Sequence, residues 1–231
     1  MELIVPAAGL STRFPGTKPK YLLTDTNNKL MIANAVSPYL EQCNVTIGIL
    51  QKHEQLYDVT TTIKNQLGND VNVIILPEVT NGPADTVYQM INLAGLSQDN
   101  PMLIKDCDSY FEHDIANGNY VCVSNVIDHD IMYKISNKSF VIVNEQNIIQ
   151  NIIEKSIISN TFCVGGYKFN RISDFLAGYN SLADIMKTEF FISHVIQYNI
   201  NNGDVFLSNP VTNYVDVGTL QDWKNHNNEY Q

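Results

Sequence analysis

The sequence predicts an α/β protein built around a mostly parallel sheet with helices on both faces. Short apolar runs without polar alternation are expected to be strands that are buried on both sides. Helix-like segments separate these runs, and such alternation is typical of parallel sheets. The expected strands are residues 3–5, 45–50, 71–76 and 102–104, with shorter ones between 120 and 143 and another over 162–169. The expected helices are residues 29–40, 53–67, a segment that ends near 96, and one that begins at 189.

Composition limits the class of protein. The chain has 231 residues, 44% of them hydrophobic, which fits one domain over residues 1–231 with a large core. The net charge of -10 argues against a nucleic-acid partner, because binding a phosphate backbone needs a basic surface. No apolar run approaches the roughly 18 residues of a membrane span, so we expect a cytoplasmic protein that does not enter a membrane. The four cysteines are widely spaced and are expected to be reduced thiols, not a disulfide or zinc framework.

The segment after the first strand predicts a binding site for a triphosphate. Ala7, Ala8 and Gly9 are too small to keep a ligand from the backbone, and a positive φ at Gly9 would let successive N–H groups form an anion-binding nest. Hydroxyl groups and cations follow at Ser11, Thr12, Arg13, Lys18 and Lys20. Ligands of open α/β sheets bind at this end of the strands. The loop is neither a Walker A loop nor a dinucleotide fingerprint. The alternative is a tight connection with solvated lysines.

A second loop, at residues 81–84, is suited to a nucleotide base. Gly82 and Ala84 flank a proline and precede a helix, so a flat base could lie against the backbone with an anion near the helix N-terminus. Asn81 and Gln89 are the polar groups expected to read the base edge. The alternative is an ordinary loop in which Asp85 begins a helix.

Two carboxylates follow the expected strand at residues 102–104. Asp106 and Asp108 would lie at its carboxyl end, beside bound phosphates. Mg²⁺ uses few protein carboxylates together with phosphate oxygens and water, so one aspartate here is enough. The alternatives are a solvated acidic turn and the metal-binding Asp-x-Asp of a glycosyltransferase.

The first loop, Gly9-Leu-Ser-Thr-Arg13 followed by Lys18-Pro-Lys20, resembles the signature of the nucleotidyltransferases that make activated sugars and related phospho-alcohols. Further stretches match that family in order up to Tyr214-Val-Asp-Val-Gly-Thr-Leu-Gln-Asp-Trp223. The resemblance implies a Rossmann-like α/β/α fold with a mixed central sheet. The nucleotide would bind to the half over residues 1–115 and the acceptor to the half over 116–231.

The resemblance also implies roles for individual residues. The nucleotide would be bound by Ala8, Gly9, Ser11, Thr12, Asn81, Gly82 and Ala84. Arg13 and Lys20 would be catalytic. Arg13 would hold the β- and γ-phosphates as they leave, and Lys20 would stabilise the negative charge at the α-phosphorus. Mg²⁺ would be held by Asp108 and Asp216, with Asp106 outside its ligand set. The acceptor would be bound by Glu154, Lys155, Gly166 and Glu189.

The expected reaction moves a nucleoside monophosphate from CTP, UTP or dTTP onto a sugar 1-phosphate or a similar small phosphorylated acceptor, with release of pyrophosphate. The partners are therefore a nucleoside triphosphate and that acceptor, and a homodimer is left open. A phosphocholine cytidylyltransferase is the nearest alternative, because aromatic side chains could enclose a quaternary ammonium. The candidates for that enclosure are Tyr110, Phe111, Tyr133, Tyr167 and Phe190. A glycosyltransferase and a nucleotide-binding domain without catalysis are more distant alternatives.

Overall fold

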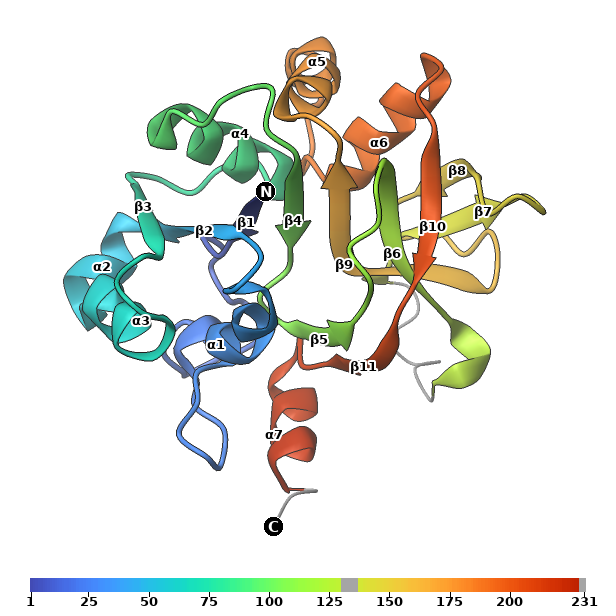
Figure 1. Ribbon diagram of the computed structural model, residues 1–231. Helices are drawn as coiled ribbons and strands as arrows, with labels where there is room; N and C mark the ends of the chain where they lie inside the picture. Colours follow the sequence, from blue (N-terminus) through green and yellow to red (C-terminus); the bar gives the residue numbers. More distant parts are fainter. Residues whose placement is uncertain (130–136, 229–231) are drawn as a thin grey trace.

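The computed structural model describes residues 1–129 and 137–228, and Tyr133 lies outside these ranges. The first half of the chain forms a parallel sheet of the expected strands, in the order β3-β2-β1-β4 (Figure 1). The strands are β1 (Glu2–Pro6), β2 (Asn44–Leu50), β3 (Asn72–Leu76) and β4 (Met102–Lys105). The helices of this half are α1 (Met31–Val36), α2 (Gln51–Tyr57), α3 (Val59–Leu67) and α4 (Pro83–Ala94). Leu3 is in register with Val45 on one side and Leu103 on the other.

The second half extends the same sheet and makes it mixed. Strand β9 (Thr161–Phe169) runs antiparallel to both β4 and β6 (Asn119–Asn125), and β10 (Phe206–Pro210) is parallel to β6 at the edge. The hairpin of β7 (Phe140–Val143) and β8 (Ile149–Ile153) pairs with β9. The helices are α5 (Ile172–Ala183), α6 (Ile192–Asn201) and α7 (Leu220–Asn228). The expected α/β/α architecture with a mixed sheet is thereby confirmed.

A small second sheet returns the end of the chain to the middle of the molecule. Strand β11 (Thr212–Asp216) pairs antiparallel with β5 (Ser109–Glu112), and Asp216 is directly opposite Ser109. This register places Asp216 next to the loop that carries Asp108.

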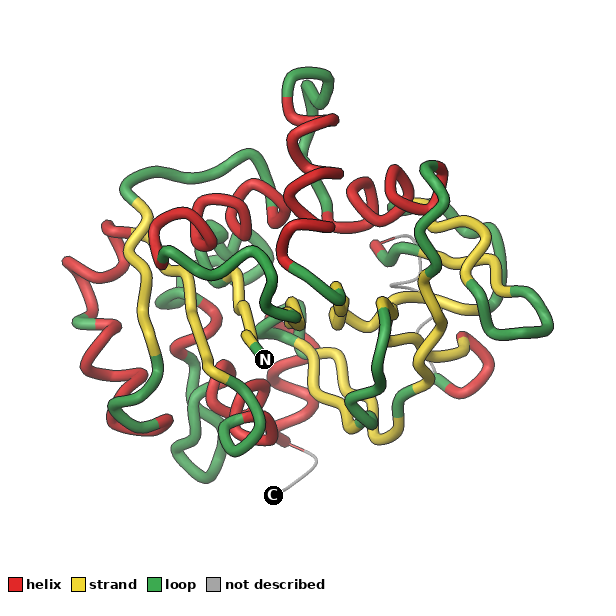
Figure 2. Tube along the Cα trace, turned by 45° about the horizontal axis from the view of Figure 1, so that its top comes forward, coloured by secondary structure: helices red, strands yellow, loops and turns green. Residues whose placement is uncertain are grey.

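The sheet separates two apolar cores. Helices lie on both sides of it (Figure 2). Successive side chains of a strand point to opposite faces. In β1, Leu3 and Val5 therefore pack in one core, with residues of α1 and α3, while Ile4 packs in the other, with residues of α4, α5 and α6. Each fully buried aliphatic side chain of this kind contributes about 1.5–3 kcal/mol to folding.

Several boundaries differ from the prediction, each for a local reason. The expected helix over 53–67 is two helices, because Asp58 adopts a left-handed φ of 46° between them. The helix expected to reach residue 40 ends at Val36 and continues as a 3₁₀ turn around Pro38, whose nitrogen cannot donate to the preceding turn. Glu189 precedes the helix that it was expected to begin, since α6 starts at Ile192.

All four cysteines are free thiols, and three of them are buried. No helix in the described part of the chain is long and apolar enough to cross a membrane.

Candidate active site

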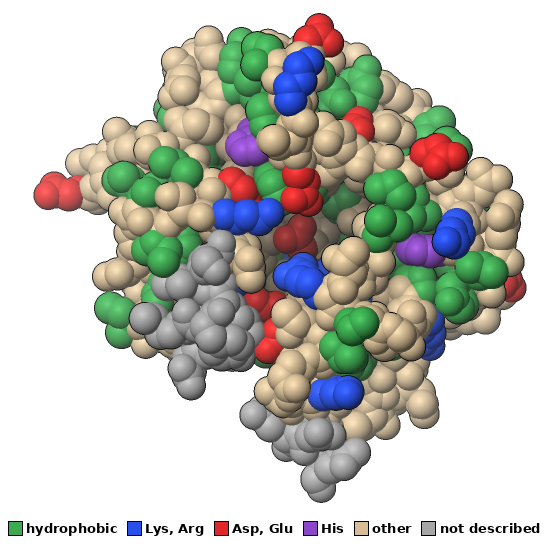
Figure 3. Space-filling model, turned by 180° about the vertical axis from the view of Figure 1, so that it is seen from behind, with side chains coloured by type: hydrophobic (Ala, Val, Ile, Leu, Met, Phe, Trp, Pro, Cys, Tyr) green, Lys and Arg blue, Asp and Glu red, His purple; other side chains and the backbone are tan. Residues whose placement is uncertain are grey.

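The loops at the carboxyl ends of β1 and β4 meet the ends of β8 and β11 around a cavity of about 510 Å³. Acidic and basic side chains gather around a central hollow on the face shown in Figure 3. Many of the residues predicted from the sequence line the cavity: Gly9, Ser11, Thr12, Arg13, Lys20, Asp108, Glu154, Lys155, Glu189 and Asp216. A cavity of this size is in the usual range for a small-molecule site.

The loop after β1 is folded back on Lys20. The Ser11 hydroxyl accepts the backbone N–H of Lys20 at 3.1 Å, and the Ser11 carbonyl accepts that of Phe14 at 2.8 Å. The positive φ angles of this loop are at Ser11 (54°) and Gly16 (73°), and Gly9 does not adopt the positive φ considered for it. A Cβ at Gly9 would meet no atom within 4 Å, which leaves that stretch of backbone open to the cavity. Lys18 is exposed and does not line the cavity.

Asp108 lies between two cations. Lys20 forms a short ion pair with Asp108 Oδ2, and a guanidinium nitrogen of Arg13 lies 3.5 Å from the same oxygen. Burial disfavours both charged forms, but the ion pair outweighs it, so the pKa of Asp108 is lowered and that of Lys20 is raised. Both groups are therefore charged at neutral pH.

Asp216 has its own cation, Lys138, which the sequence analysis did not single out. Lys138 Nζ lies 2.5 Å from Asp216 Oδ2 and donates to the Tyr214 hydroxyl at 2.8 Å. Burial disfavours the charged form of Lys138, but the neighbouring tyrosine and aspartate outweigh it and raise its pKa. In the sequence, Lys138 stands at a polar break between short strands, with no signal that separates it from a surface lysine.

The two aspartates converge on Gly218. A Cβ built at Gly218 would lie 2.9 Å from Asp216 Oδ1 and 3.1 Å from Asp108 Oδ2, so one small space separates oxygens that are far apart in sequence. Two carboxylates that lie this close together and line the cavity fit Mg²⁺, which completes its shell with phosphate oxygens and water. Among residues 1–129 and 137–228 there is no group of three His, Cys, Asp or Glu side chains that could hold a metal alone.

Asp106 is beside this pair. Burial and the negative charge of Asp108 raise its pKa to about 6. It packs against Gly165, which has a φ of 87° and lines the cavity, and a Cβ at that glycine would lie 2.8 Å from the Asp106 Cβ. Gly166 faces the other way, toward Cys122 and Phe111, so Gly165 is the glycine of β9 that a ligand can approach.

Glu154 and Lys155 follow β8 at the far end of the cavity. The Glu154 carboxylate accepts hydrogen bonds from the hydroxyl groups of Ser139 and Ser193, the latter at 2.8 Å. Lys155 has a positive φ of 53°, and its Nζ lies 3.4 Å from Glu189 Oε2 and 4.2 Å from the centre of the Phe191 ring. These side chains form a polar end of the cavity with one aromatic wall.

The aromatic residues considered for an ammonium enclosure are dispersed. Tyr167 lines the cavity. Phe111 and Phe190 are buried in the two large cores, and Tyr110 packs with a small cluster that contains Trp223. Phe191, which the sequence analysis did not select, lines the cavity instead.

The loop predicted for the base begins α4. Gly82 has a φ of 108°, and a Cβ there would lie 2.7 Å from the backbone of Phe190, so the position requires glycine. The Asn81 N–H and the Gln89 side chain both donate to Asp85, at 2.8 and 3.3 Å. The side chain of Ala84 is fully buried in a core, as is nearly all of Ala8, and Pro83 is the member of residues 81–84 that lines the cavity.

The mixed α/β/α sheet, which carries a polar cavity at the carboxyl ends of its strands, has the same fold as the solved structures described below. No protein-family profile matches the chain, and no curated protein matches it in sequence.

Three solved structures show the likeness. The nucleoside-diphosphate-sugar pyrophosphorylase from Vibrio cholerae RC9 superposes with a TM-score of 0.81 at 18% identity, covering 96% of this chain and 98% of its own. The inositol-1-phosphate CTP transferase from T. maritima gives a TM-score of 0.74 at 18% identity, covering 96% and 90%. A UDP-glucose pyrophosphorylase complexed with UDP-glucose gives 0.75 at 15% identity, covering 99% and 97%. At these identities the likeness establishes the fold.

Proposed function

We propose that this protein is a nucleotidyltransferase that joins a nucleoside monophosphate, taken from a nucleoside triphosphate, to a small phosphorylated acceptor and releases pyrophosphate. The observation that carries the proposal is the convergence of Asp108 and Asp216 on one space, among Arg13, Lys20 and Lys138, in a cavity that continues to Glu154 and Lys155. A substrate pair with phosphates at its centre and a polar acceptor at one end matches this distribution of charge.

The chain's own residues supply position and charge, which account for most of the rate in phosphoryl transfers. Arg13 and Lys20 would neutralise the phosphates of the triphosphate as negative charge moves onto the leaving pyrophosphate, and their position beside Asp108 supports this role. Lys155 would hold the acceptor, and Glu154, which accepts hydrogen bonds from two hydroxyl groups, would accept another from an acceptor hydroxyl. The attacking phosphate is already ionised, so no general base is required.

Asp108 and Asp216 would hold Mg²⁺. When bound, the ion supplies charge neutralisation between the two phosphate groups and orients them.

We propose a sugar 1-phosphate as the acceptor and CTP, UTP or dTTP as the donor. Glu154 and Glu189 support a hydroxyl-rich acceptor, because carboxylates accept several hydrogen bonds. Phe191 and Tyr167 support the second candidate, phosphocholine, because aromatic faces attract an ammonium group. The Phe191 ring already contacts one such group, the ammonium of Lys155.

The test is pyrophosphate release from each of the four common nucleoside triphosphates, mixed with Mg²⁺ and with glucose 1-phosphate, another sugar 1-phosphate, inositol phosphate or phosphocholine. We expect release only when triphosphate and acceptor are both present. Release with phosphocholine and with no sugar phosphate would select the second candidate. No release with any pair, together with glycosyl transfer from a nucleotide sugar, would replace the proposal by a glycosyltransferase.

A further inference from the structure

Lys138 neutralises Asp216 through Oδ2, the carboxylate oxygen that is not the one beside Gly218. Its ammonium bonds one carboxylate oxygen at 2.5 Å, while the other oxygen accepts the backbone N–H of Gly218 at 2.8 Å. The side chains of Lys138 and Asp216 are only 17% and 10% exposed. Removing one partner from so shielded an ion pair is costly, because the charge left behind has little water to replace it. A divalent ion that binds Asp216 through Oδ1 therefore meets a carboxylate whose charge the Lys138 ammonium already neutralises, and the ammonium stays until another anion receives it.

The backbone of Lys138 connects the metal end of the cavity to the acceptor end. Its carbonyl accepts the N–H of Lys155 at 3.1 Å, and the next residue, Ser139, donates its hydroxyl to Glu154. One short segment thus joins Asp216 to the side chains proposed to bind the acceptor. A phosphate that enters between these two ends comes within reach of the Lys138 ammonium.

The charges explain when such a displacement is favourable. Each of the two aspartates is already paired with a cation: Asp108 with Lys20 and Arg13, and Asp216 with Lys138. A divalent ion that arrives alone must break an ion pair and then remain close to positive charges that repel it. Nucleotide phosphates change the balance, because they offer each displaced ammonium a charge-assisted hydrogen bond.

We propose that Lys138 is the counter-ion of Asp216 in the free protein and moves to a substrate phosphate when nucleotide enters, so that a divalent metal binds together with the triphosphate and not before it. This inference rests on the proposed function, and it assigns Lys138 as a phosphate-binding residue of the transfer reaction.

The test measures metal binding without turnover. Mn²⁺ is titrated into the protein and its free ion is followed by electron paramagnetic resonance, with and without CTP, UTP or dTTP and with no acceptor present. Titrations without protein correct for Mn²⁺ held by free nucleotide. We expect the wild-type protein to bind Mn²⁺ weakly alone and at least tenfold more tightly with its triphosphate. In Lys138→Met, affinity for Mn²⁺ alone should rise about tenfold, and the effect of nucleotide should shrink.

Two variants control for charge and fold. Lys138→Arg keeps the cation and should behave as the wild type. Lys155→Met removes a cation from the same cavity without touching either aspartate, so its affinity for Mn²⁺ alone should stay at the wild-type value. Should thermal denaturation show that Lys138→Met does not fold, Lys138→Gln provides the same comparison.

Tight binding of Mn²⁺ by the free wild-type protein would overturn the inference. The inference would also fail if Lys138→Met bound Mn²⁺ no more tightly than the wild-type protein does. The same holds if neither protein binds Mn²⁺ in the absence of nucleotide. If no triphosphate changes the affinity of the wild-type protein, the proposed function fails as well, and the titrations without nucleotide still decide whether Lys138 competes with the metal.

Discussion

Replacing Gly218 by alanine tests the geometry of the cavity with one methyl group. The new Cβ would lie 2.9 Å from Asp216 Oδ1, 3.1 Å from Asp108 Oδ2 and 3.5 Å from a guanidinium nitrogen of Arg13. Both carboxylate oxygens are at the ends of side chains and can move by a few tenths of an ångström. The backbone φ of Gly218 is not left-handed, so alanine is tolerated there, and the loss of glycine's freedom in the unfolded chain is worth about 0.4–1 kcal/mol in its favour.

Catalysis should be far more sensitive than stability. The methyl group fills the space between the two aspartates, and misplacement of reacting groups by roughly 1 Å costs about 100-fold in rate, or about 2.7 kcal/mol. We expect Gly218→Ala to lower kcat/KM about 100-fold and to raise the Mg²⁺ concentration needed for half-maximal rate, with a free energy of unfolding within about 1 kcal/mol of the wild type. Pyrophosphate release over a Mg²⁺ series and urea unfolding measure the two effects.

Gly9→Ala is the matched control, since it adds the same methyl group in the same cavity with no atom within 4 Å. Its Mg²⁺ requirement should equal that of the wild type, whatever its effect on nucleotide affinity. Wild-type turnover with an unchanged Mg²⁺ requirement in Gly218→Ala would refute the assignment of this space to the metal.

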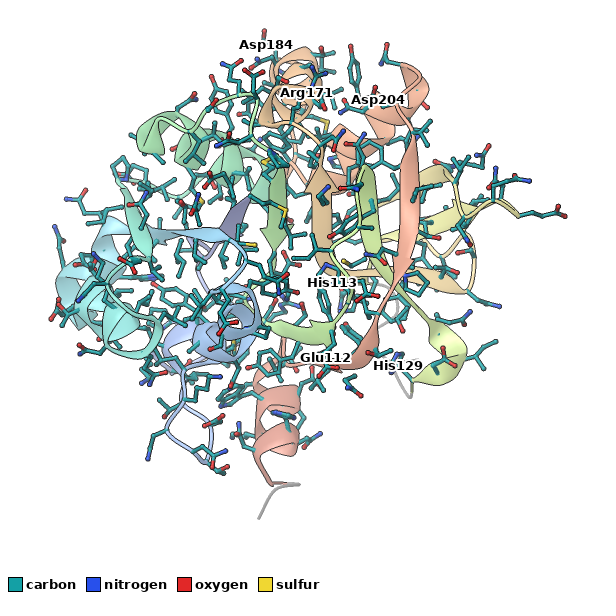
Figure 4. The ribbon with its side chains drawn as sticks, in the orientation of Figure 1. Glu112, His113, His129, Arg171, Asp184 and Asp204 are labelled. Atoms are coloured by element: carbon teal, nitrogen blue, oxygen red, sulfur yellow. The ribbon has the colours of Figure 1, made fainter. Side chains whose placement is uncertain are left out.

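Three further predictions follow from contacts of single side chains. Lys20→Met should lower kcat about 100-fold, because a cation beside the transferred phosphate is removed, and should lower the free energy of unfolding, because Asp108 keeps only Arg13 as a partner. Unchanged turnover in steady-state kinetics would contradict the catalytic role. Ser193→Ala should raise the acceptor KM several-fold more than it lowers kcat, because Ser193 fixes the Glu154 carboxylate at 2.8 Å, and equal KM values would show that Glu154 needs no such support. His113 lies beside β5 (Figure 4), hydrogen-bonded to Tyr120 at 3.1 Å, and burial lowers its pKa to about 4. The unfolded chain takes up that proton first, near pH 6.5, so the contribution of His113 to the free energy of unfolding should be constant above this pH and fall toward pH 4, by at most roughly 3 kcal/mol. In urea unfolding, the free energy of unfolding of His113→Gln should depend less on pH than that of the wild type. An identical pH dependence would show that other groups cause the loss of stability at low pH.

The parallel half of the fold could be predicted because its signals are local. A strand buried on both faces must be apolar throughout, so the runs at residues 3–5, 45–50, 71–76 and 102–104 were visible without knowledge of their neighbours. The small residues and cations between Gly9 and Lys20 were visible for the same reason. Their place at the carboxyl end of β1 follows from the topology of parallel sheets.

Contacts between distant segments could be predicted only where a whole motif carried them. The resemblance of the Asp-Val-Gly-Thr stretch to a family motif predicted that Asp216 lies near Asp108, and the antiparallel register of β11 with β5 supplies the physical link. Which of the two glycines, Gly165 or Gly166, faces the cavity depends on the register of two strands, which the sequence does not show. The register of β6 with β9 shifts between Val121 and Val123, and this irregularity turns Gly165 toward the cavity.

The sequence by itself therefore determined the fold class, the positions of the strands of its parallel half, and which loop brings small residues and cations to the cavity, since each depends on residues close together in the chain. Only the tertiary structure decided that Lys138 neutralises Asp216, that Ser139 and Ser193 hold Glu154, and that Phe191 forms the aromatic wall. These contacts join residues from separate elements, and a lysine or serine has the same local pattern on a solvated surface as in a cavity. Burial and the partner across the cavity distinguish the two, and both arise when the strands have come together.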